Sequence, residues 1–200
     1  MKRIFPILCS VFALVVIACA GSSTPNRYYT LAGENISKAG QSLPYRLVLQ
    51  KFAVDPAYAQ PNIVYRESPY EFMSYGNDFW ASSPERQVEN LFADAFEKSG
   101  LFASVERRAS EIPDLELSGV LNALEEIDSD SSASYARVAV ELSLRNGKTG
   151  KTIWKRSFDE RQKLESRKPV EVAKAASILV NRYAGTALRE IGENLGENPL

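Results

Sequence analysis

Hydrophobic residues are distributed in two ways along this chain, as one uninterrupted run at the N-terminus and as periodic patterns after it. The run, residues 4–17, is apolar except for Pro6 and Ser10 and lies between the basic start Met1-Lys2-Arg3 and the small residues 18–23. This order is typical of a secretory signal peptide. Because about 14 apolar residues are fewer than the roughly 20 of a membrane-spanning helix, we expect the segment to be removed.

From residue 28 onward the apolar positions first recur with the period of strands. Residues 28–31 are short and extended, and residues 45–54 combine β-branched and alternating apolar side chains. Residues 62–66 and 70–75 flank Glu67-Ser68-Pro69 and are predicted to form a hairpin. Strands therefore dominate the first part of the folded region.

Three further strands are predicted in the second half of the chain, and residues 137–145 are the clearest of them. In residues 137–145, valines and leucines alternate with charged and hydroxyl side chains, which is typical of a sheet that is buried on one face. Residues 146–150 are predicted to turn the chain into another strand. That strand carries three large apolar side chains: Ile153, Trp154 and Phe158.

Two helices are predicted, each beginning at a proline. Ser83 is placed to be the N-cap of the first helix, Pro84 its first residue and Gly100 its C-terminal stop. Its apolar positions repeat at helical spacing: Val88, Leu91, Phe92, Ala95 and Phe96. Pro169 opens the second helix. The apolar stripe of that helix contains Val172, Ala176, Leu179, Tyr183, Ala187, Ile191 and Leu195.

The order of these elements predicts an α+β fold, in which a largely antiparallel or mixed β-sheet carries two helices packed on one face. No repeat or second linker appears, so residues 28–195 are expected to form a single domain and residues 196–200 a C-terminal tail. Gly21 to Asn26 reads as a flexible tether that reaches at most about 20 Å. The folded region should therefore lie close to whatever holds the N-terminus.

Val16-Ile17-Ala18-Cys19 resembles the lipobox of bacterial lipoproteins. The resemblance implies that residues 1–18 are a lipoprotein signal peptide, that Cys19 becomes the lipidated first residue, and that residues 19–27 form the lipidated cysteine and tether. Ala20 implies, by analogy with enterobacterial sorting, transport to the outer membrane. Two alternatives stay open, a soluble exported protein cleaved at Ala18-Cys19-Ala20 and an uncleaved anchor.

Composition excludes several classes of function. Lys and Arg number 24 against 25 Asp and Glu, so the net charge of -1 gives no field that favours nucleic acid as a partner. The chain has no histidine, which excludes His-dependent catalysis and His metal ligands. Its two cysteines, Cys9 and Cys19, both lie near the N-terminus and cannot supply a zinc cluster. The Ser-Lys dyad, nucleophile-elbow and phosphate-loop motifs are missing as well. We therefore expect no enzyme activity and no cofactor.

One acidic cluster is the best candidate for carboxylate chemistry. It contains Glu125, Glu126, Asp128 and Asp130. Residues 128–132 resemble a calcium loop but lack its glycine and its terminal glutamate, so we expect a solvated turn and no metal site. A hydrolase that uses a pair of carboxylates is the enzymatic alternative.

Aromatic residues are concentrated between Tyr58 and Trp80. Six of them form a candidate partner surface: Tyr65, Tyr70, Phe72, Tyr75, Phe79 and Trp80. Exposed aromatic side chains suit a protein interface or a lipid contact. The alternative is that they belong to the core and cover the edges of the sheet.

Charge is segregated in the second half of the chain. Residues 106–141 hold nine acidic and three basic side chains, whereas residues 145–174 hold ten basic and four acidic ones. If these charges reach different edges of the sheet, copies could assemble head to tail into a homo-oligomer. The candidate charged interface comprises Glu125, Glu126, Lys151, Lys155 and Arg156. Solvated strand faces, intramolecular pairing and contact of Lys155 and Arg156 with anionic lipid headgroups are the alternatives.

Four segments together carry a family resemblance. They are the lipobox cysteine, Tyr28-Tyr29-Thr30-Leu31, the stretch Asn77-Asp78-Phe79-Trp80-Ala81-Ser82-Ser83-Pro84, and the helix end Ser99-Gly100-Leu101-Phe102-Ala103-Ser104-Val105. In this order they resemble the ABC-type transport auxiliary lipoproteins, which include the paraquat-inducible protein C type. The chain departs from the common pattern in the loop before the first helix, where many relatives have a basic residue just ahead of the tryptophan.

The resemblance implies a non-enzymatic lipoprotein of the Gram-negative outer membrane that faces the periplasm. It implies work beside an ABC transporter and a substrate-binding protein of the mammalian-cell-entry type, which move lipids between membranes and maintain membrane integrity. An envelope enzyme or a structural lipoprotein of an unrelated complex remains the alternative at this point.

Overall fold

The computed structural model describes residues 24–108, 111–130 and 133–200. The predicted signal peptide, Cys19 and the first tether residues lie outside the described residues, as do Ser131 and Ser132 of the acidic turn. Within the described ranges no helix is long and apolar enough to cross a membrane.

A curled sheet of nine strands forms most of the described chain. The strands are β1 (Arg27–Tyr29), β2 (Leu43–Leu49), β3 (Ala53–Val54), β4 (Asn62–Arg66), β5 (Met73–Trp80), β6 (Phe102–Glu106), β7 (Leu115–Asp130), β8 (Ala133–Asn146) and β9 (Thr152–Lys163). The helices are a short 3-10 helix, η1 (Pro56–Tyr58), and two long α-helices, α2 (Pro84–Ser99) and α3 (Pro169–Glu197).

The sheet is mixed, and β7 lies in its interior. β7, β8 and β9 form an antiparallel meander. On the other side of β7, the short strands β2, β3 and β4 pair with it in parallel. β4 and β5 form the predicted hairpin, and β1 adds to β5 in parallel. The predicted α+β class with a mixed sheet is confirmed.

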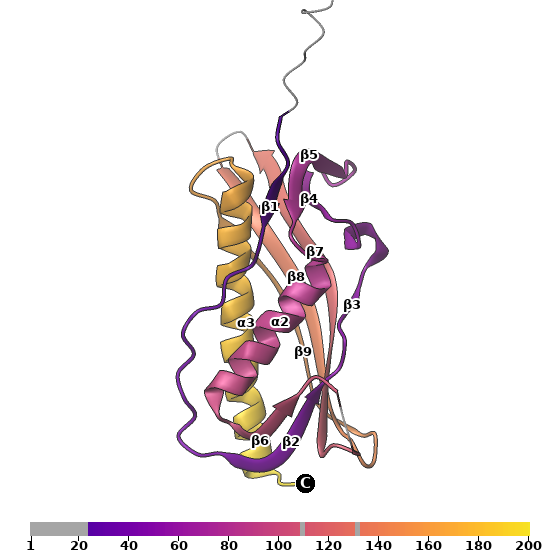
Figure 1. The fold of residues 1–200 in the computed structure, drawn as a ribbon, viewed down its shortest axis with the longest axis vertical. Helices are drawn as coiled ribbons and strands as arrows, with labels where there is room; N and C mark the ends of the chain where they lie inside the picture. The colour runs from indigo at the N-terminus through magenta and orange to yellow at the C-terminus, as the bar shows by residue number, and fades with distance from the viewer. Residues whose placement is uncertain (1–23, 109–110, 131–132) are drawn as a thin grey trace, which may run out of the picture.

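Both helices cover the same face of the sheet, as predicted (Figure 1). The alternation in β8 is confirmed, because Val138, Val140, Leu142 and Leu144 are buried. Tyr183 of α3 is buried against this face, where its hydroxyl donates to the carbonyl of Val138 at 2.9 Å. Side chains from the sheet and both helices therefore share one hydrophobic cluster.

The predicted limits of α2 are confirmed, although the N-cap hydroxyl does not cap the backbone. The helix begins at Pro84 and stops at Gly100, whose φ of 64° is the left-handed conformation that glycine adopts most easily. The Ser83 hydroxyl donates to a Glu85 carboxylate oxygen at 2.5 Å instead of bonding a helix amide. Asn77 to Trp80, expected to be a loop, forms the second half of β5 and pairs with β1.

The molecule is elongated, and its two ends differ (Figure 1). The N-terminal end holds the start of β1, the turn between β4 and β5, and the loop between β9 and α3. The C-terminal end holds the last turns of α3, the start of β2, and the turn between β8 and β9. With 29 residues, α3 runs about 43 Å from one end to the other.

Candidate functional site

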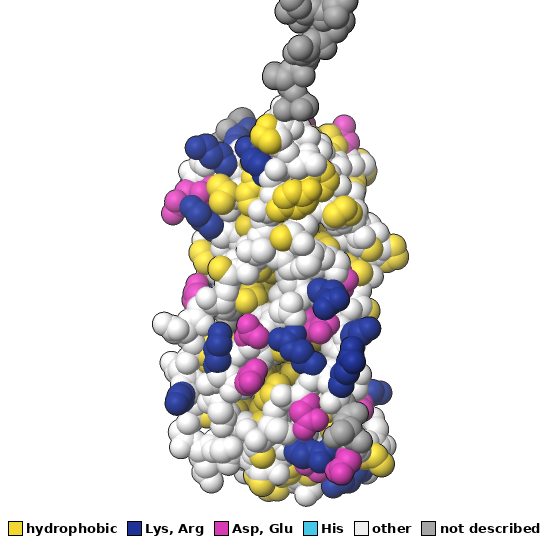
Figure 2. All heavy atoms as spheres, viewed as in Figure 1, with side chains coloured by type: hydrophobic (Ala, Val, Ile, Leu, Met, Phe, Trp, Pro, Cys, Tyr) yellow, Lys and Arg dark blue, Asp and Glu magenta, His cyan; other side chains and the backbone are white. Residues whose placement is uncertain are grey.

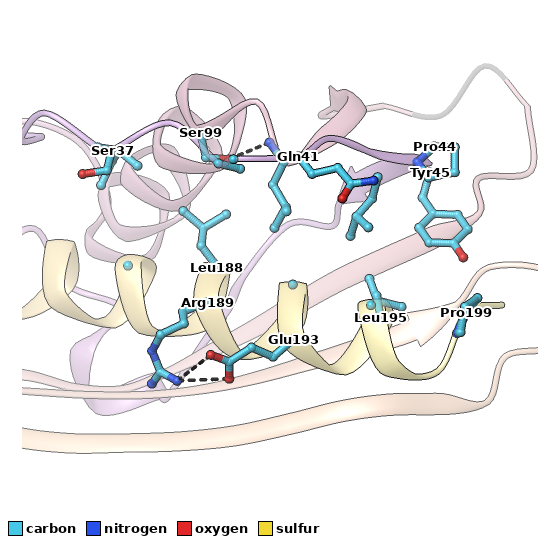
Figure 3. A pocket seen from close by; sticks show the side chains of 18 of the residues that line it. Ser37, Gln41, Pro44, Tyr45, Ser99, Leu188, Arg189, Glu193, Leu195 and Pro199 are labelled. Carbon is cyan, nitrogen blue, oxygen red and sulfur yellow. Dashed lines mark hydrogen bonds and ion pairs between the residues drawn. The ribbon is translucent and has the colours of Figure 1, made fainter.

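An open groove of about 900 Å³ lies at the C-terminal end, between α3 and the chain that leads into β2 (Figure 3). Much of its lining is apolar and comes from α3, β2, the connection after α2 and the residues after α3: Leu43, Pro44, Leu101, Leu188, Leu195 and Pro199. Its volume falls within the roughly 300–1,000 Å³ of typical ligand pockets. The groove is therefore large enough for an apolar chain or a short peptide segment.

Three glycines of α3 leave space in the groove that side chains would otherwise fill. Gly185, Gly192 and Gly196 of α3 all line it, and a Cβ atom added at Gly185 or Gly196 would meet no heavy atom within 4 Å. In a helix, each glycine costs about 0.8–1.0 kcal/mol of stability relative to alanine. The missing side chains thus leave open space that an ordinary helix surface would fill.

Buried polar side chains hold the opposite wall in place. Residues 30–42, here called the strap, cross both helices before β2. Ser177 accepts a hydrogen bond from the Ala32 amide at 2.9 Å, and Asn181 donates to the Ala32 carbonyl at 2.9 Å and accepts from the Glu34 amide at 3.1 Å. Gln87 of α2 also binds the strap, because its side-chain oxygen accepts a hydrogen bond from the Leu31 amide. Sequence analysis missed these residues, although polar side chains within apolar helix stripes were a signal.

The rim of the groove is polar. Arg189 donates to both carboxylate oxygens of Glu193, at 3.4 and 3.2 Å (Figure 3). At the far end, the Tyr45 hydroxyl accepts from the Leu200 amide at 3.0 Å. The carboxylate that lines this groove is therefore already paired with a cation.

A second, smaller cavity of about 290 Å³ is lined by Glu125 and three arginines. Glu125 is 1% exposed and accepts from the Tyr58 hydroxyl at 2.6 Å, from Arg66 at 2.7 Å and from Arg137 at 2.8 Å. Arg137 also forms two hydrogen bonds of 2.8 Å with Asp159. The network joins β4, β7, β8 and β9 on the sheet face that the helices do not cover.

The network changes the proton affinities of its members. Burial, together with the hydrogen bond to Glu125, raises the pKa of Tyr58 to about 12. The hydrogen bond from Arg137 holds the pKa of Asp159 below its ordinary value. These shifts favour a neutral phenol and a charged Asp159 at neutral pH, as expected for a structural ion-pair network.

Glu126 points to the other side of β7 and has a different environment. It is 2% exposed and accepts a hydrogen bond of 2.7 Å from the Tyr75 hydroxyl. Burial raises the pKa of its carboxyl above the ordinary value. Because the folded chain binds this proton more tightly than the unfolded chain does, the contribution of Glu126 to stability is greatest below the ordinary glutamate pKa. It is lost as pH rises through the raised value.

The substitution Glu126→Gln is therefore expected to raise the free energy of unfolding at pH 7 by on the order of 1 kcal/mol. The gain should disappear below about pH 4, where glutamic acid is itself neutral. Urea unfolding at both pH values measures the difference, with the exposed Glu97→Gln on α2 as control. A less stable variant at pH 7 would show that the charged form of Glu126 is favoured by the fold.

The structure separates the six aromatic residues of the candidate partner surface. Trp80 is 3% exposed and packs in the core, so its assignment to an exposed surface is wrong. Tyr65, Tyr75 and Phe79 are half-buried. Tyr70 is 96% exposed and Phe72 37%. Two of the six are therefore well exposed, both near the turn between β4 and β5.

The structure also separates the members of the candidate charged interface. Glu125 and Glu126 are buried, so their assignment to an exposed interface is wrong. Lys155 pairs with Glu141 at 2.9 Å, Arg156 pairs with Glu190 at 3.4 Å, and Lys151 is exposed.

The condition for head-to-tail assembly, that the acidic and basic segments reach different edges of the sheet, is not met, and the alternative of intramolecular pairing is observed. β8 lies between β7 and β9 in the sheet, so acidic and basic side chains meet across neighbouring strands. Besides the pair of Lys155 with Glu141, Arg145 of β8 contacts Glu116 of β7 at 3.0 Å.

No group of three or more metal-ligating side chains occurs among the residues whose structure is described. Asp128 of the acidic cluster accepts from the Ser134 hydroxyl at 2.8 Å and pairs with Arg167 at 3.1 Å. Its carboxylate is thus engaged within the chain.

Comparisons with known proteins show the family through a sequence model and the fold through solved structures. A family model described as ABC-type transport auxiliary lipoprotein component matches residues 29–186. The crystal structure of protein XCC0632 from Xanthomonas campestris is similar with a TM-score of 0.77 and 18% identity, over 86% of this chain and 98% of that one. The hypothetical protein CT253 from Chlamydia trachomatis gives a TM-score of 0.53 and 7% identity, over 78% and 100%. No curated protein matches the sequence.

Proposed function

Because the chain belongs to the family of ABC-type transport auxiliary lipoprotein components, we propose that it is a non-enzymatic lipoprotein of the Gram-negative outer membrane. Residues 1–18 are removed as a signal peptide, and lipid on Cys19 holds the chain on the periplasmic side. Residues 19–27 tether the single domain of residues 28–195, which ends in the tail 196–200. The domain assists an ABC transporter and a cell-entry-type substrate-binding protein that move lipids and maintain membrane integrity.

The observation that carries this proposal is the position of the groove. It lies at the C-terminal end, whereas the chain leads to Cys19 from the N-terminal end (Figure 1). A domain anchored by its N-terminus presents the groove away from the anchoring membrane, toward the other subunits of a transport assembly. We assign the groove to an apolar segment of such a protein partner, because its lining offers leucines and prolines inside a polar rim.

The state of the carboxylates supports a docking role over catalysis. Glu193, at the groove, is bonded to Arg189, and Glu125, at the smaller cavity, is bonded to two arginines and a tyrosine. A carboxylate-pair hydrolase needs one acid and one base that face the same substrate. Each of these two cavities is instead lined by one carboxylate, already held by cations.

The substitution Gly185→Trp tests the groove, because Gly185 lines it and a Cβ atom added there meets no heavy atom within 4 Å, so a bulky ring can be attached at this wall. We expect the intact lipidated variant to lose about tenfold or more of its affinity for the transport subunits, since filling a central pocket costs at least about 1.4 kcal/mol of binding. The measurement is copurification from the native membranes, with permease and cell-entry subunits identified and quantified by mass spectrometry.

A matched control is Ile178→Trp, which places the same ring two turns earlier on α3, at an exposed position outside the groove. This variant should copurify the transport subunits as the parent does. Equal recovery with Gly185→Trp would contradict the assignment of the groove. Absence of any transport subunit from the parent complex would contradict the proposed function itself.

A further inference from the structure

The tether fixes which end of the domain lies nearest the membrane. Gly21 to Asn26 spans at most about 20 Å even when extended, and the strand that follows starts at the N-terminal end of the molecule. If Cys19 carries lipid, as the proposed function states, this end cannot move far from the bilayer. Its surface chemistry therefore decides whether it touches lipid.

Exposed aromatic side chains are found at this end. Tyr70, at the turn between β4 and β5, is 96% exposed, and Tyr28 in β1 is 64% exposed. Phe72, 37% exposed, packs edge-on against Tyr58 with a ring distance of 5.4 Å and lies under the guanidinium of Arg66. Figure 2 shows hydrophobic side chains gathered over part of this end, with basic and acidic side chains beside them, and further acidic and basic side chains interspersed lower down.

Basic side chains accompany the aromatic ones. The end of β9 and the loop to α3 carry Arg161, Lys163, Arg167 and Lys168 against one acidic residue, Glu165, and all five are exposed. Arg167 pairs with Asp128 at 3.1 Å. The turn between β4 and β5 adds Glu67 and Glu71, so the positive charge is concentrated on the loop beside α3.

We infer that this end, defined by Tyr28, Tyr70, Phe72, Lys163 and Lys168 and here called the lipid-facing surface, rests on the headgroup region of the anchoring bilayer. Tyrosine rings are stable at the boundary between water and hydrocarbon, where the ring is apolar and the hydroxyl hydrated. Lys163 at the end of β9 and Lys168 on the adjoining loop attract anionic headgroups. The bilayer is thus a second contact of the domain, beyond the lipid anchor, and it keeps the groove pointing away from the membrane.

The test uses the intact lipidated chain in vesicles of phosphatidylcholine with a minor fraction of phosphatidylglycerol. The variants Tyr70→Cys and Ile112→Cys each receive a fluorescent thiol label, because Cys9 is removed with the signal and Cys19 is blocked by lipid. Ile112 is a matched control, 71% exposed, in the connection that leads into the first residue of β7, Leu115, far from the start of β1. Lipids with a quencher near the headgroup should reduce emission from position 70 and leave position 112 unchanged.

Charge reversal tests the electrostatic part in the same vesicles. Lys163→Glu together with Lys168→Glu should shift the equilibrium away from the quenched orientation by at least about twenty-fivefold, because the loss of each basic charge alone accounts for about fivefold. The control Lys151→Glu, at the C-terminal end, should leave it unchanged. Thermal unfolding should show that the label at position 70 alters stability by less than about 0.5 kcal/mol.

The outcomes separate this inference from the proposed anchor. Flotation of the chain with the vesicles, with quenching at position 70 alone, supports the lipid-facing surface. Flotation without quenching at position 70, or with equal quenching at both positions, overturns the surface and leaves the anchor intact. Failure to float contradicts the anchor and the surface together.

Discussion

Replacing Arg66 and Arg137 together by methionine is expected to lower the free energy of unfolding by about 3–5 kcal/mol, the typical cost of leaving a buried charge without its partners. Glu125 is 1% exposed, and these two arginines supply its cationic partners. Either single substitution leaves one cation and the Tyr58 hydroxyl in place. The singles should therefore cost much less, and the double should exceed their sum.

Urea unfolding of the four chains in this double-mutant cycle measures the coupling. The variant that also carries Glu125→Leu should recover most of the lost stability, because an apolar side chain removes the uncompensated charge. Additive effects, or no recovery in the triple variant, would show that Glu125 does not depend on the arginines. Either result would contradict a stabilising role for the network of Glu125, Arg66 and Arg137.

Removing the acylation site, Cys19, should change the location of the protein more than any other substitution proposed above. A Cys19→Ser chain, exported with an ordinary cleavable signal peptide in place of residues 1–18, is expected to move almost completely from the detergent phase to the aqueous phase on detergent partition. Two or more acyl chains give stable anchoring, whereas surface contacts alone are reversible. The Cys9→Ser chain is the matched control and should remain in the detergent phase, because Cys9 belongs to the removed segment. Retention of the Cys19→Ser chain in the detergent phase would contradict anchoring through this residue.

Elements that depend on neighbouring residues could be predicted from the sequence. The limits of α2 follow from Pro84 and Gly100, whose backbone preferences act locally. The buried face of β8 follows from the alternation of its valines and leucines with mostly polar residues, because a one-residue change of register would expose every valine and leucine. The family resemblance likewise depends on short local segments, such as the one that ends at Pro84 and the one that contains Gly100.

The pairing of distant strands could not be predicted in the same way. β2, β3 and β4 join β7 in parallel although long stretches of chain separate them. Because β4 lies beside β7, Glu125 meets Arg66, and this is why Glu125 is buried although the acidic cluster to which it belongs was expected to form a solvated turn. Charges of opposite sign on neighbouring strands likewise pair, a consequence of strand order that composition does not contain.

The groove could not be predicted from the sequence, because it exists where glycines of α3 have no side chains to fill the space. Gly185 and Gly196 are isolated helix glycines with no local signature, and their effect depends on the strap that lies opposite. The role of Gly119 in β7 also depends on a distant residue, although here the missing side chain allows a close contact: a Cβ atom would come within 2.5 Å of the Phe52 ring. Such close approaches are visible only once both partners are placed.

The most direct test of the account is the mass of the N-terminal peptide of the native protein. We expect the peptide to begin at Cys19 and to carry a thioether-linked diacylglycerol, usually with an additional N-acyl chain. An unmodified N-terminus, together with recovery of the protein in the aqueous phase after detergent partition, would contradict it.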